Sequence, residues 1–260
     1  MAGSLQTLIR DLRLRRGRER RGLALAEGVR LIEEALVTGI GFRGAAVAPT
    51  LEGTTRGKAL KAALEHAGVP LVEVSDRELV DLADTEHPQG IVAAIEPRRW
   101  SLADLPTGAG SVILVLDGVQ DPGNVGTILR TTLALGGAGV VALKGTAELH
   151  NPKVVRGSMG ALFRLPAVSV SEAELVPWLA ERGLDLWVTD ARGEPPPPPS
   201  GVAAARRPIA LALGSEGAGV SATLTARATR RVGVPLAPGA ESLNVAVAAG
   251  ILLYEVRRAD

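Results

Sequence analysis

The sequence of 260 residues contains no cysteine, which excludes disulfide bonds, thiolate metal sites, iron–sulfur clusters and cysteine nucleophiles. Its three histidines are too scattered to predict a metal site. The longest apolar run, Val245–Leu253, contains a glycine and is far shorter than the roughly 20 residues of a transmembrane helix. The N-terminus also lacks an apolar signal-peptide core. We therefore expect no membrane segment and no bound metal, with the cytoplasm as the default location.

Lysine is scarce, so most of the positive charge is carried by arginine. The formal net charge is only +1, yet the first 22 residues hold seven arginines against two acidic residues, an excess of about five positive charges. A guanidinium pairs bidentately with phosphate and stacks on bases. The run is interpreted either as a nucleic-acid contact or as a solvated arginine-rich surface, because charge alone does not decide between them.

Two domains are predicted from the way the pattern changes along the chain. The first covers residues 1–98 and begins with a basic N-terminal arm, 1–22; a linker rich in proline and glycine, 99–110, precedes the second domain, 111–260. Short helices alternate with short apolar strands in the first domain, which predicts a small α/β fold. The predicted strands are 45–48, 71–74 and 91–95, and the predicted helices are 27–38, 58–66 and 76–82.

The second domain opens with a continuous apolar run, Val112–Leu116, which is typical of a strand buried on both faces of a parallel sheet. A helix is predicted at Asn244–Arg258, and an exposed polyproline loop that acts as a spacer at Pro195–Pro199. These patterns predict an α/β domain with a parallel sheet. Its further strands are predicted at 140–143, 167–170, 184–189, 209–213 and 231–234.

Polar, glycine-containing turns follow three of these strands, at Asp121–Asn124, Gly214–Gly217 and Pro235–Asn244. Ligands of open parallel sheets bind outside the carboxyl ends of the strands, so three such turns at one edge would form a site. The chain has no P-loop motif. A weak dinucleotide fingerprint, Gly217 to Ala222, lacks the acidic residue that would hold a ribose, and leaves a nucleotide-dependent oxidoreductase as a minor alternative.

The same turns lie in longer motifs. "LDGVQDPGNVGTILRTTLALG", "NPKVVRGSMGALFRLP", "LALGSEGAGVS" and "VPLAPGAESLNVAVAAGILLYEVRR" resemble, in order, the motifs of the SpoU (TrmH-like) branch of the SPOUT RNA methyltransferases. In the first domain, "LALAEGVRLIEEALVTG" and "ELVDLADTEHPQGIVAAI" are similar to the substrate-binding domain that precedes many such enzymes. The resemblance covers most of residues 111–258 and, more loosely, the first domain.

This resemblance implies a ribose 2′-O-methyltransferase that uses S-adenosylmethionine, with a trefoil-knotted catalytic domain, an α/β RNA-binding domain before it, and a homodimer. Ribosomal RNA is the preferred substrate because the chain has a separate first domain, whereas transfer-RNA members tend to be a bare knot. The alternatives are a transfer-RNA methyltransferase and an RNA-binding knot protein that has lost its chemistry. All five residues of the family's active-site set are present, which argues against the loss of activity.

That set, carried over by resemblance, is Asn124, Arg130, Glu216, Ser242 and Asn244. The resemblance places Arg130 at the phosphate and the 2′-hydroxyl, where it either accepts the proton or stabilises the developing alkoxide; the second role is easier for a guanidinium, which normally stays protonated. Helix capping is another possible role for Ser242 or Asn244, and we expect Asn124 both to cap its helix and to serve the site.

The donor pocket of the family is formed largely by backbone groups, which map onto Thr189, Gly214, Val234 and Leu243. A turn that ends a strand would explain the glycine at 214 nearly as well as a close ligand does. The family usually carries a second serine where this chain has Ala246, and we expect activity to survive that change. His87 could contact RNA, although a turn-stabilising role is favoured, and the other two histidines are interpreted as surface residues.

Overall fold

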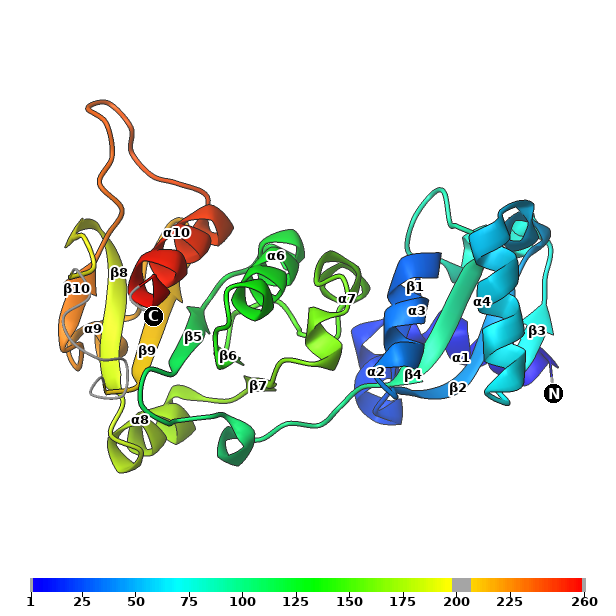
Figure 1. The fold of residues 1–260 in the computed structure, drawn as a ribbon, viewed down its shortest axis with the longest axis horizontal. Coiled ribbons are helices and arrows are strands. Elements are labelled where there is room, and N and C mark those ends of the chain that lie inside the picture. The colour runs from blue at the N-terminus through cyan, green and yellow to red at the C-terminus, as the bar shows by residue number, and fades with distance from the viewer. Residues whose placement is uncertain (1, 198–206, 259–260) are drawn as a thin grey trace. The chain divides into compact units, whose positions relative to one another are not determined.

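The computed structural model describes residues 2–197 and 207–258 and divides the chain into two compact units (Figure 1). The first unit contains the chain up to Arg98 together with a later segment, His150–Arg164. The second contains Arg99–Leu149 and the chain from Leu165 onward. Within the described ranges, no helix is long and apolar enough to cross a membrane. In the polyproline run, Pro195–Pro197 form no helix or strand, and Pro198 and Pro199 lie outside the described residues.

The sheet of the first unit has the strand order β1-β4-β2-β3. β4 lies antiparallel to both of its neighbours, and β2 and β3 are parallel. β1 is a strand that the helical pattern of this stretch concealed, and it forms only because its four residues pair with β4 far along the chain. The strands are β1 (Ala24–Glu27), β2 (Gly41–Val47), β3 (Leu71–Glu73) and β4 (Ile91–Glu96).

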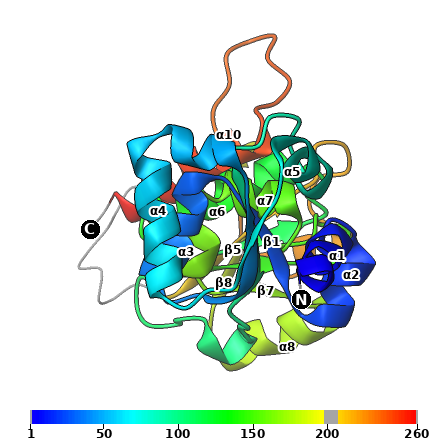
Figure 2. The ribbon, with the colours of Figure 1, turned by 90° about the vertical axis from the view of Figure 1, so that its right-hand side faces the viewer.

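Helices cover both faces of this sheet. Figure 2 shows α3 and α4 on one side of β1, and α1, α2 and α5 on the other. The apolar side chains of α1 and α5 close one core with residues of β1, β2 and β4. The helices are α1 (Ala2–Leu12), α2 (Arg15–Arg21), α3 (Val29–Val37), α4 (Thr55–His66) and α5 (Asp76–Leu82), with a 3-10 turn η1 (Pro49–Gly53).

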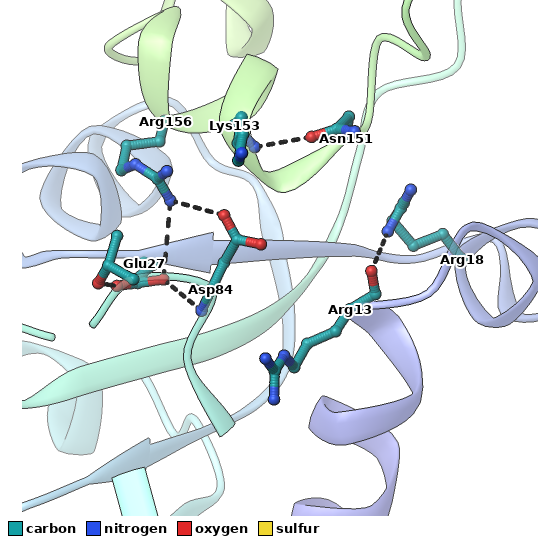
Figure 3. Close-up of polar contacts among 8 residues, drawn as sticks. Arg13, Arg18, Glu27, Asp84, Asn151, Lys153 and Arg156 are labelled. Carbon is teal, nitrogen blue, oxygen red and sulfur yellow. Dashed lines mark hydrogen bonds and ion pairs between the residues drawn. The ribbon is translucent and has the colours of Figure 1, made fainter. Parts of the chain in front are cut away.

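The basic N-terminal stretch is not an extended arm. α1 buries Ile9 and Leu12 completely, so it is part of the core of the first unit. Arg18 is also buried, and its Nη1 donates to the carbonyl oxygens of Leu12 and Arg13, both at 2.9 Å. Figure 3 shows the bond to Arg13. The expected arm is therefore a pair of helices, and the first has apolar residues, among them Ile9 and Leu12, at the spacing of an amphipathic helix.

The segment His150–Arg164 leaves the second unit and packs on the first. It contains α7 (Pro152–Gly157), which lies beside β1, and the 3-10 turn η3 (Ala161–Phe163). Arg156 pairs with Asp84 at 3.2 Å, and Arg164 pairs with Glu34 at 2.7 Å. In sequence the segment falls inside the predicted second domain, so its attachment to the first unit is a finding of the structure.

The second unit is built on a parallel sheet with the order β10-β8-β9-β5-β6-β7. The α/β class and the parallel sheet expected from the sequence are confirmed. β8 runs five residues beyond its predicted end. The strands are β5 (Val112–Asp117), β6 (Gly139–Ala142), β7 (Ala167–Ser169), β8 (Asp185–Glu194), β9 (Ile209–Gly214) and β10 (Arg230–Val232).

The helices of this unit cover the sheet and its ends. One core cluster joins the side chains of β5, β8 and β9 to those of α8, including Trp178. α10 packs against α6 and can be followed in Figure 1 from the orange loop that precedes it. The helices are η2 (Leu102–Asp104), α6 (Pro122–Ala134), α8 (Glu172–Glu181), α9 (Ala222–Thr225) and α10 (Val245–Arg257).

Candidate functional site

The first predicted turn connects the carboxyl end of β5 to the start of α6. Asp121, and not Asn124, is the N-cap of this helix: its carboxylate accepts from the backbone N–H groups of Gly123 and Asn124, at 3.1 and 3.3 Å. The expectation that Asn124 caps the helix is therefore wrong. Because the aspartate satisfies the free N–H groups, the side chain of Asn124 is available for other contacts.

Asn124 links the three turns through its amide. Its Nδ2 donates to Glu216 Oε1 at 3.2 Å, and its Oδ1 accepts from Asn244 Nδ2 at 2.9 Å. Residues 92 and 120 positions away in the sequence are thus brought to one place at the carboxyl edge of the sheet. The amide uses both its donor and its acceptor, so the position of each partner is fixed by a directional bond.

Asn244 has a second role at the start of α10. Its Oδ1 accepts from the backbone N–H groups of Ala246 and Val247, at 2.9 and 3.3 Å, so Asn244 is the N-cap of this helix. Capping by Asn244 was one of the alternatives that the sequence left open. Since the cap uses Oδ1 and the bond to Asn124 uses Nδ2, one side chain serves both the helix and the polar chain.

A cavity of about 200 Å³ opens at the same edge, between the ends of β8 and β9 and the loop before α10. Thr189, Gly214, Val234 and Leu243 all line it, as do Glu216 and Ser242. Its walls are mainly apolar, with the carboxylate-bearing residues Asp190 and Glu216 also among the lining residues. The four positions assigned to the donor pocket therefore face one shared space.

Gly214 is required by the chain's own turn. A Cβ at this position would lie 2.0 Å from the carbonyl carbon of Gly219, because residues 215–219 fold back as an isolated bridge between Ser215 and Gly219. Gly217 in the same turn has open space around it. Of the two explanations given for a glycine at this position, a turn that ends the strand and a close ligand, the turn is sufficient.

A second cavity, of about 350 Å³, adjoins the first and is lined by Asp121, Asn124 and Glu216. Ser215, Glu216 and Val245 line both cavities, so the polar chain reaches their junction through Glu216. One cavity is thus bordered by apolar side chains and the other by polar ones. This arrangement suits two ligands that must meet at Glu216 and Asn124.

Arg130 is not brought to this polar chain. It lies six residues beyond Asn124, which is about 9 Å along an α-helix. Its side chain is exposed, and within the described part of the chain it lines neither cavity. The structure therefore gathers Asn124, Glu216, Ser242 and Asn244 and leaves Arg130 farther along α6.

Several contributors to this edge were not predicted. Asp121 supplies the cap of α6, and Asp117 Oδ2 accepts from the backbone N–H of Ser221 at 2.8 Å, which holds the chain after the Gly214 turn. Leu236 and Asp190 line the apolar cavity. The aspartate before Pro122 was a visible capping signal, since proline is favoured at the first helical position. In the described residues, no group of three or more metal-ligating side chains comes together.

The second unit has a parallel sheet with two adjoining cavities at the carboxyl ends of its strands. This arrangement is typical of ligand-binding α/β proteins with an open sheet. Residues 111–254 match the family model described as the SpoU rRNA methylase family. Residues 7–93 match a model described as an MRM3-like substrate binding domain. The chain therefore belongs to the SpoU rRNA methylase family, as the sequence motifs led us to expect.

Individual relatives cover nearly the whole chain. The 23S rRNA (guanosine(2553)-2′-O)-methyltransferase RlmP of Bacillus subtilis is 34% identical over 95% of this chain and 94% of its own. The crystal structure of the SpoU methyltransferase AviRb from Streptomyces viridochromogenes, in complex with the cofactor AdoMet, aligns with a TM-score of 0.85 at 30% identity, over 97% of this chain and 96% of that one. An AdoMet-bound rRNA methyltransferase from Sinorhizobium meliloti aligns with a TM-score of 0.82 at 29% identity, covering 97% and 94%.

Proposed function

We propose that this protein transfers the methyl group of S-adenosylmethionine to a ribose 2′-hydroxyl of ribosomal RNA. The observation that carries the proposal is the pair of adjoining cavities joined by the Asn244–Asn124–Glu216 chain in a member of the SpoU family. Relatives whose printed names give this reaction on 23S rRNA cover nearly all of the chain. The matched substrate-binding domain favours ribosomal RNA over transfer RNA, and ribosomal RNA in turn favours the cytoplasm.

The apolar cavity fits the cofactor in its chemistry. Leucine and valine side chains suit an adenine ring, and carboxylate-bearing residues at its border suit the positive charge of a sulfonium. Thr189, Gly214, Val234 and Leu243 would hold the cofactor. When bound, S-adenosylmethionine supplies a methyl group that an oxygen nucleophile can attack.

The chain's own residues would position and charge-balance the ribose oxygen. Asn124, fixed by its bonds to Glu216 and Asn244, lines the polar cavity beside Glu216, which borders both cavities. Rigid amides of this kind contribute by orientation, because the geometry is set before the substrate arrives. We assign Arg130 to the RNA phosphate and to the alkoxide that develops as the hydroxyl loses its proton, since a guanidinium normally remains protonated. Because Arg130 lines neither cavity of its own protomer, this role requires an active site at the interface of the proposed homodimer, as the family resemblance implies, with the arginine presented by the second copy. Ser242 would complete the polar rim of the donor cavity.

A homodimer is part of this proposal, and α10 provides the support. This helix is apolar on both sides: Leu252 and Leu253 are buried, whereas Val247, Ile251 and Tyr254 share the opposite face and are 51%, 38% and 52% exposed. A two-fold axis would bury this stripe against the same stripe of a second copy. The trefoil knot expected from the family resemblance is proposed with it.

The proposed reaction is tested with the full-length protein, tritiated S-adenosylmethionine and ribosomal RNA from a strain that lacks the gene. A methyl group on the 2′-oxygen blocks alkaline cleavage of the next phosphodiester bond, so the label should appear in alkali-resistant dinucleotides. Label on a base, or transfer to transfer RNA alone, would contradict the proposal. Analytical ultracentrifugation tests the dimer, which Ile251→Arg should dissociate.

A further inference from the structure

A separate cavity of about 250 Å³ lies in the first unit. Three segments form it: the start of α3, the loop between α5 and β4, and α7 with the residues after it. Its volume is near the lower end of the roughly 300–1,000 Å³ of pockets for drug-sized ligands, and one side of it is open to solvent, so a ligand can lie partly outside it. The residues that matter for the argument are Arg30, His87, Gln89, Arg156 and Met159.

One wall of the cavity is fixed by a buried carboxylate. The Glu27 side chain is 5% exposed; its Oε2 accepts from the backbone N–H of Asp84 at 2.9 Å, and its Oε1 accepts from Thr85 Oγ1. Arg156 Nη1 pairs with Asp84 at 3.2 Å and approaches Glu27 at 3.8 Å (Figure 3). The loop and α7 are therefore held together, and the guanidinium of Arg156 is already neutralised by carboxylates.

The other walls of the cavity carry hydrogen-bond donors that have no partner in the described residues. Arg30 and His87 are exposed, and within the described ranges neither side chain makes a hydrogen bond or an ion pair. Gln89 accepts from the backbone N–H of Val29 through Oε1, at 3.2 Å, which leaves its amide N–H groups for another partner. Nearby arginines are paired instead, as Arg56 is with Glu33. A ligand rich in acceptors would complete this set.

Met159 adds backbone strain at the same place. Among the described residues it is the one non-glycine residue with a positive φ, at 50°. A left-handed conformation is unfavourable for a side chain with a Cβ and tends to occur at functional sites, where the surroundings impose it. Met159 lines the cavity, and methionine side chains pack favourably against aromatic rings.

We propose that this cavity binds one unpaired nucleotide of the RNA substrate, an inference that rests on the proposed function. Arg30 would hold the phosphate, the free donors of His87 and Gln89 would reach acceptors on the base and ribose, and Met159 would pack against the base. Proteins recognise RNA mainly through unstacked bases in single-stranded loops. A base in a continuous duplex would not enter a cavity of this kind.

The test uses the full-length protein and a fluorescent single-stranded RNA oligonucleotide, with the same sequence as a duplex for comparison. The double variant Arg30→Ala, His87→Ala should bind the single strand about tenfold more weakly, as expected for the loss of one charge-assisted contact. Arg30→Ala alone should reduce the slope of log K against log salt by about 0.7. Arg77→Ala removes an exposed arginine of the same unit that does not line the cavity, and it should bind as the wild type does.

Cross-linking a thiouridine-containing single strand should attach it to the peptides that contain His87 or Met159. Equal binding by the double variant and the wild type, no single-strand binding by the wild type, or cross-links confined to other segments would overturn the inference. Both substituted side chains are exposed and unpaired in the described residues, so the variants should unfold at the wild-type temperature. Methyl transfer to ribosomal RNA by the wild type is assayed in parallel. If the double variant binds the single strand more weakly but the wild type methylates no ribose, the proposed function is contradicted, whereas the cavity is supported as an RNA-binding site.

Discussion

The two units use their polar side chains in different ways. In the first, ion pairs are distributed over the surface, as between Arg56 and Glu33 or Lys61 and Glu52. In the second, the amides of Asn124 and Asn244 and the carboxylate of Glu216 are gathered at the carboxyl edge of one sheet. Dispersed surface pairs contribute little to stability, whereas convergent groups beside cavities are typical of a reactive site. The convergent polar groups of the second unit therefore mark it as the unit that carries the candidate site.

The arginine-rich N-terminus shows why charge counts mislead. Arg20 and Arg21 both pair with Asp11, at 2.7 and 2.6 Å, and the two arginines hold the pKa of that carboxyl below its ordinary value. Arg15 pairs with Glu19, and Arg18 is buried against carbonyl oxygens. Much of the local excess of positive charge is thus used within the fold. The position of an arginine, more than the number of arginines, indicates where RNA binds.

The largest effect on the chemistry of the second unit is expected from substitution of Arg130. Arg130→Ala should lower kcat for methyl transfer by about 10²–10³-fold, because a positioned charge at a developing oxyanion is worth that much. Binding of S-adenosylmethionine, measured by calorimetry, should be unchanged, since Arg130 lines neither cavity. Arg182→Ala, at the end of α8, is the matched control and should retain activity. Turnover near the wild-type rate would remove Arg130 from the mechanism.

Gly214 tests whether the second unit depends on its turn geometry. Gly214→Ala should destabilise that unit by about 3 kcal/mol, because the added Cβ would meet the backbone of Gly219 at 2.0 Å. The three tryptophans, Trp100, Trp178 and Trp187, all belong to the second unit, so their fluorescence reports its unfolding. Gly217→Ala, in open space within the same turn, should leave the denaturation midpoint in place. Equal midpoints for the two variants would show that the turn can relax.

The sequence predicted the second unit better than the first. Its parallel strands are buried on both faces, so runs such as Val112–Leu116 stand out, and their observed ends lie within a residue or two except at the end of β8. In the first unit, β1 depends on antiparallel pairing with a strand almost 70 residues away, which local periodicity cannot show. The helix α1 was missed for another reason: its apolar residues Leu5, Leu8, Ile9 and Leu12 have helical spacing, but the interpretation of this stretch rested on its charge.

The residues of the candidate site were also predicted only in part. The strand-end turns and the family motifs pointed to Asn124, Glu216 and Asn244, and these three side chains meet. Which residue caps α6 was missed, because asparagine and aspartate are equally good caps and the signal of Pro122, which marks Asp121 as the residue before the first helical position, was not used. The attachment of α7 to Glu27 could not be foreseen either, since it joins residues about 130 positions apart.

Substitution of Glu27 tests what stabilises the first unit, as substitution of Gly214 does for the second. Glu27→Gln keeps the shape of the side chain but removes its charge, so that the amide group faces the donors of Asp84 and Arg156. We expect a loss of roughly 2 kcal/mol, less than for a fully buried pair because Arg156 is partly exposed. The loss should appear in circular dichroism and leave the tryptophan transition unchanged. Glu19→Gln, which breaks an exposed pair, should have almost no effect. A shift of the tryptophan transition would show that the two units unfold together.

The smallest effect is expected at two matching helix caps, one in each unit. Ser75 begins α5 and Ser171 begins α8, and each forms a capping box with the glutamate three residues on. The pKa of Glu78 and that of Glu174 are lowered by bonds from the backbone N–H and then the hydroxyl of that serine. Ser75→Ala and Ser171→Ala should each lower the melting temperature by a few degrees, the first by circular dichroism and the second by tryptophan fluorescence.

The pH dependence of stability in these two variants distinguishes two bonds of the serine hydroxyl: the one that it donates to the carboxylate and the one that it accepts from the backbone N–H. A lowered carboxyl pKa contributes stability above the ordinary value of 4.5, and that contribution is lost as the pH falls through the lowered value. The difference between wild type and each variant should therefore be constant above about pH 5 and narrow in more acidic buffer. It should not vanish, because the hydroxyl also accepts from the glutamate's N–H, a bond that does not titrate. A difference that is the same at every pH would mean that the hydroxyl-to-carboxylate bond contributes nothing in either unit.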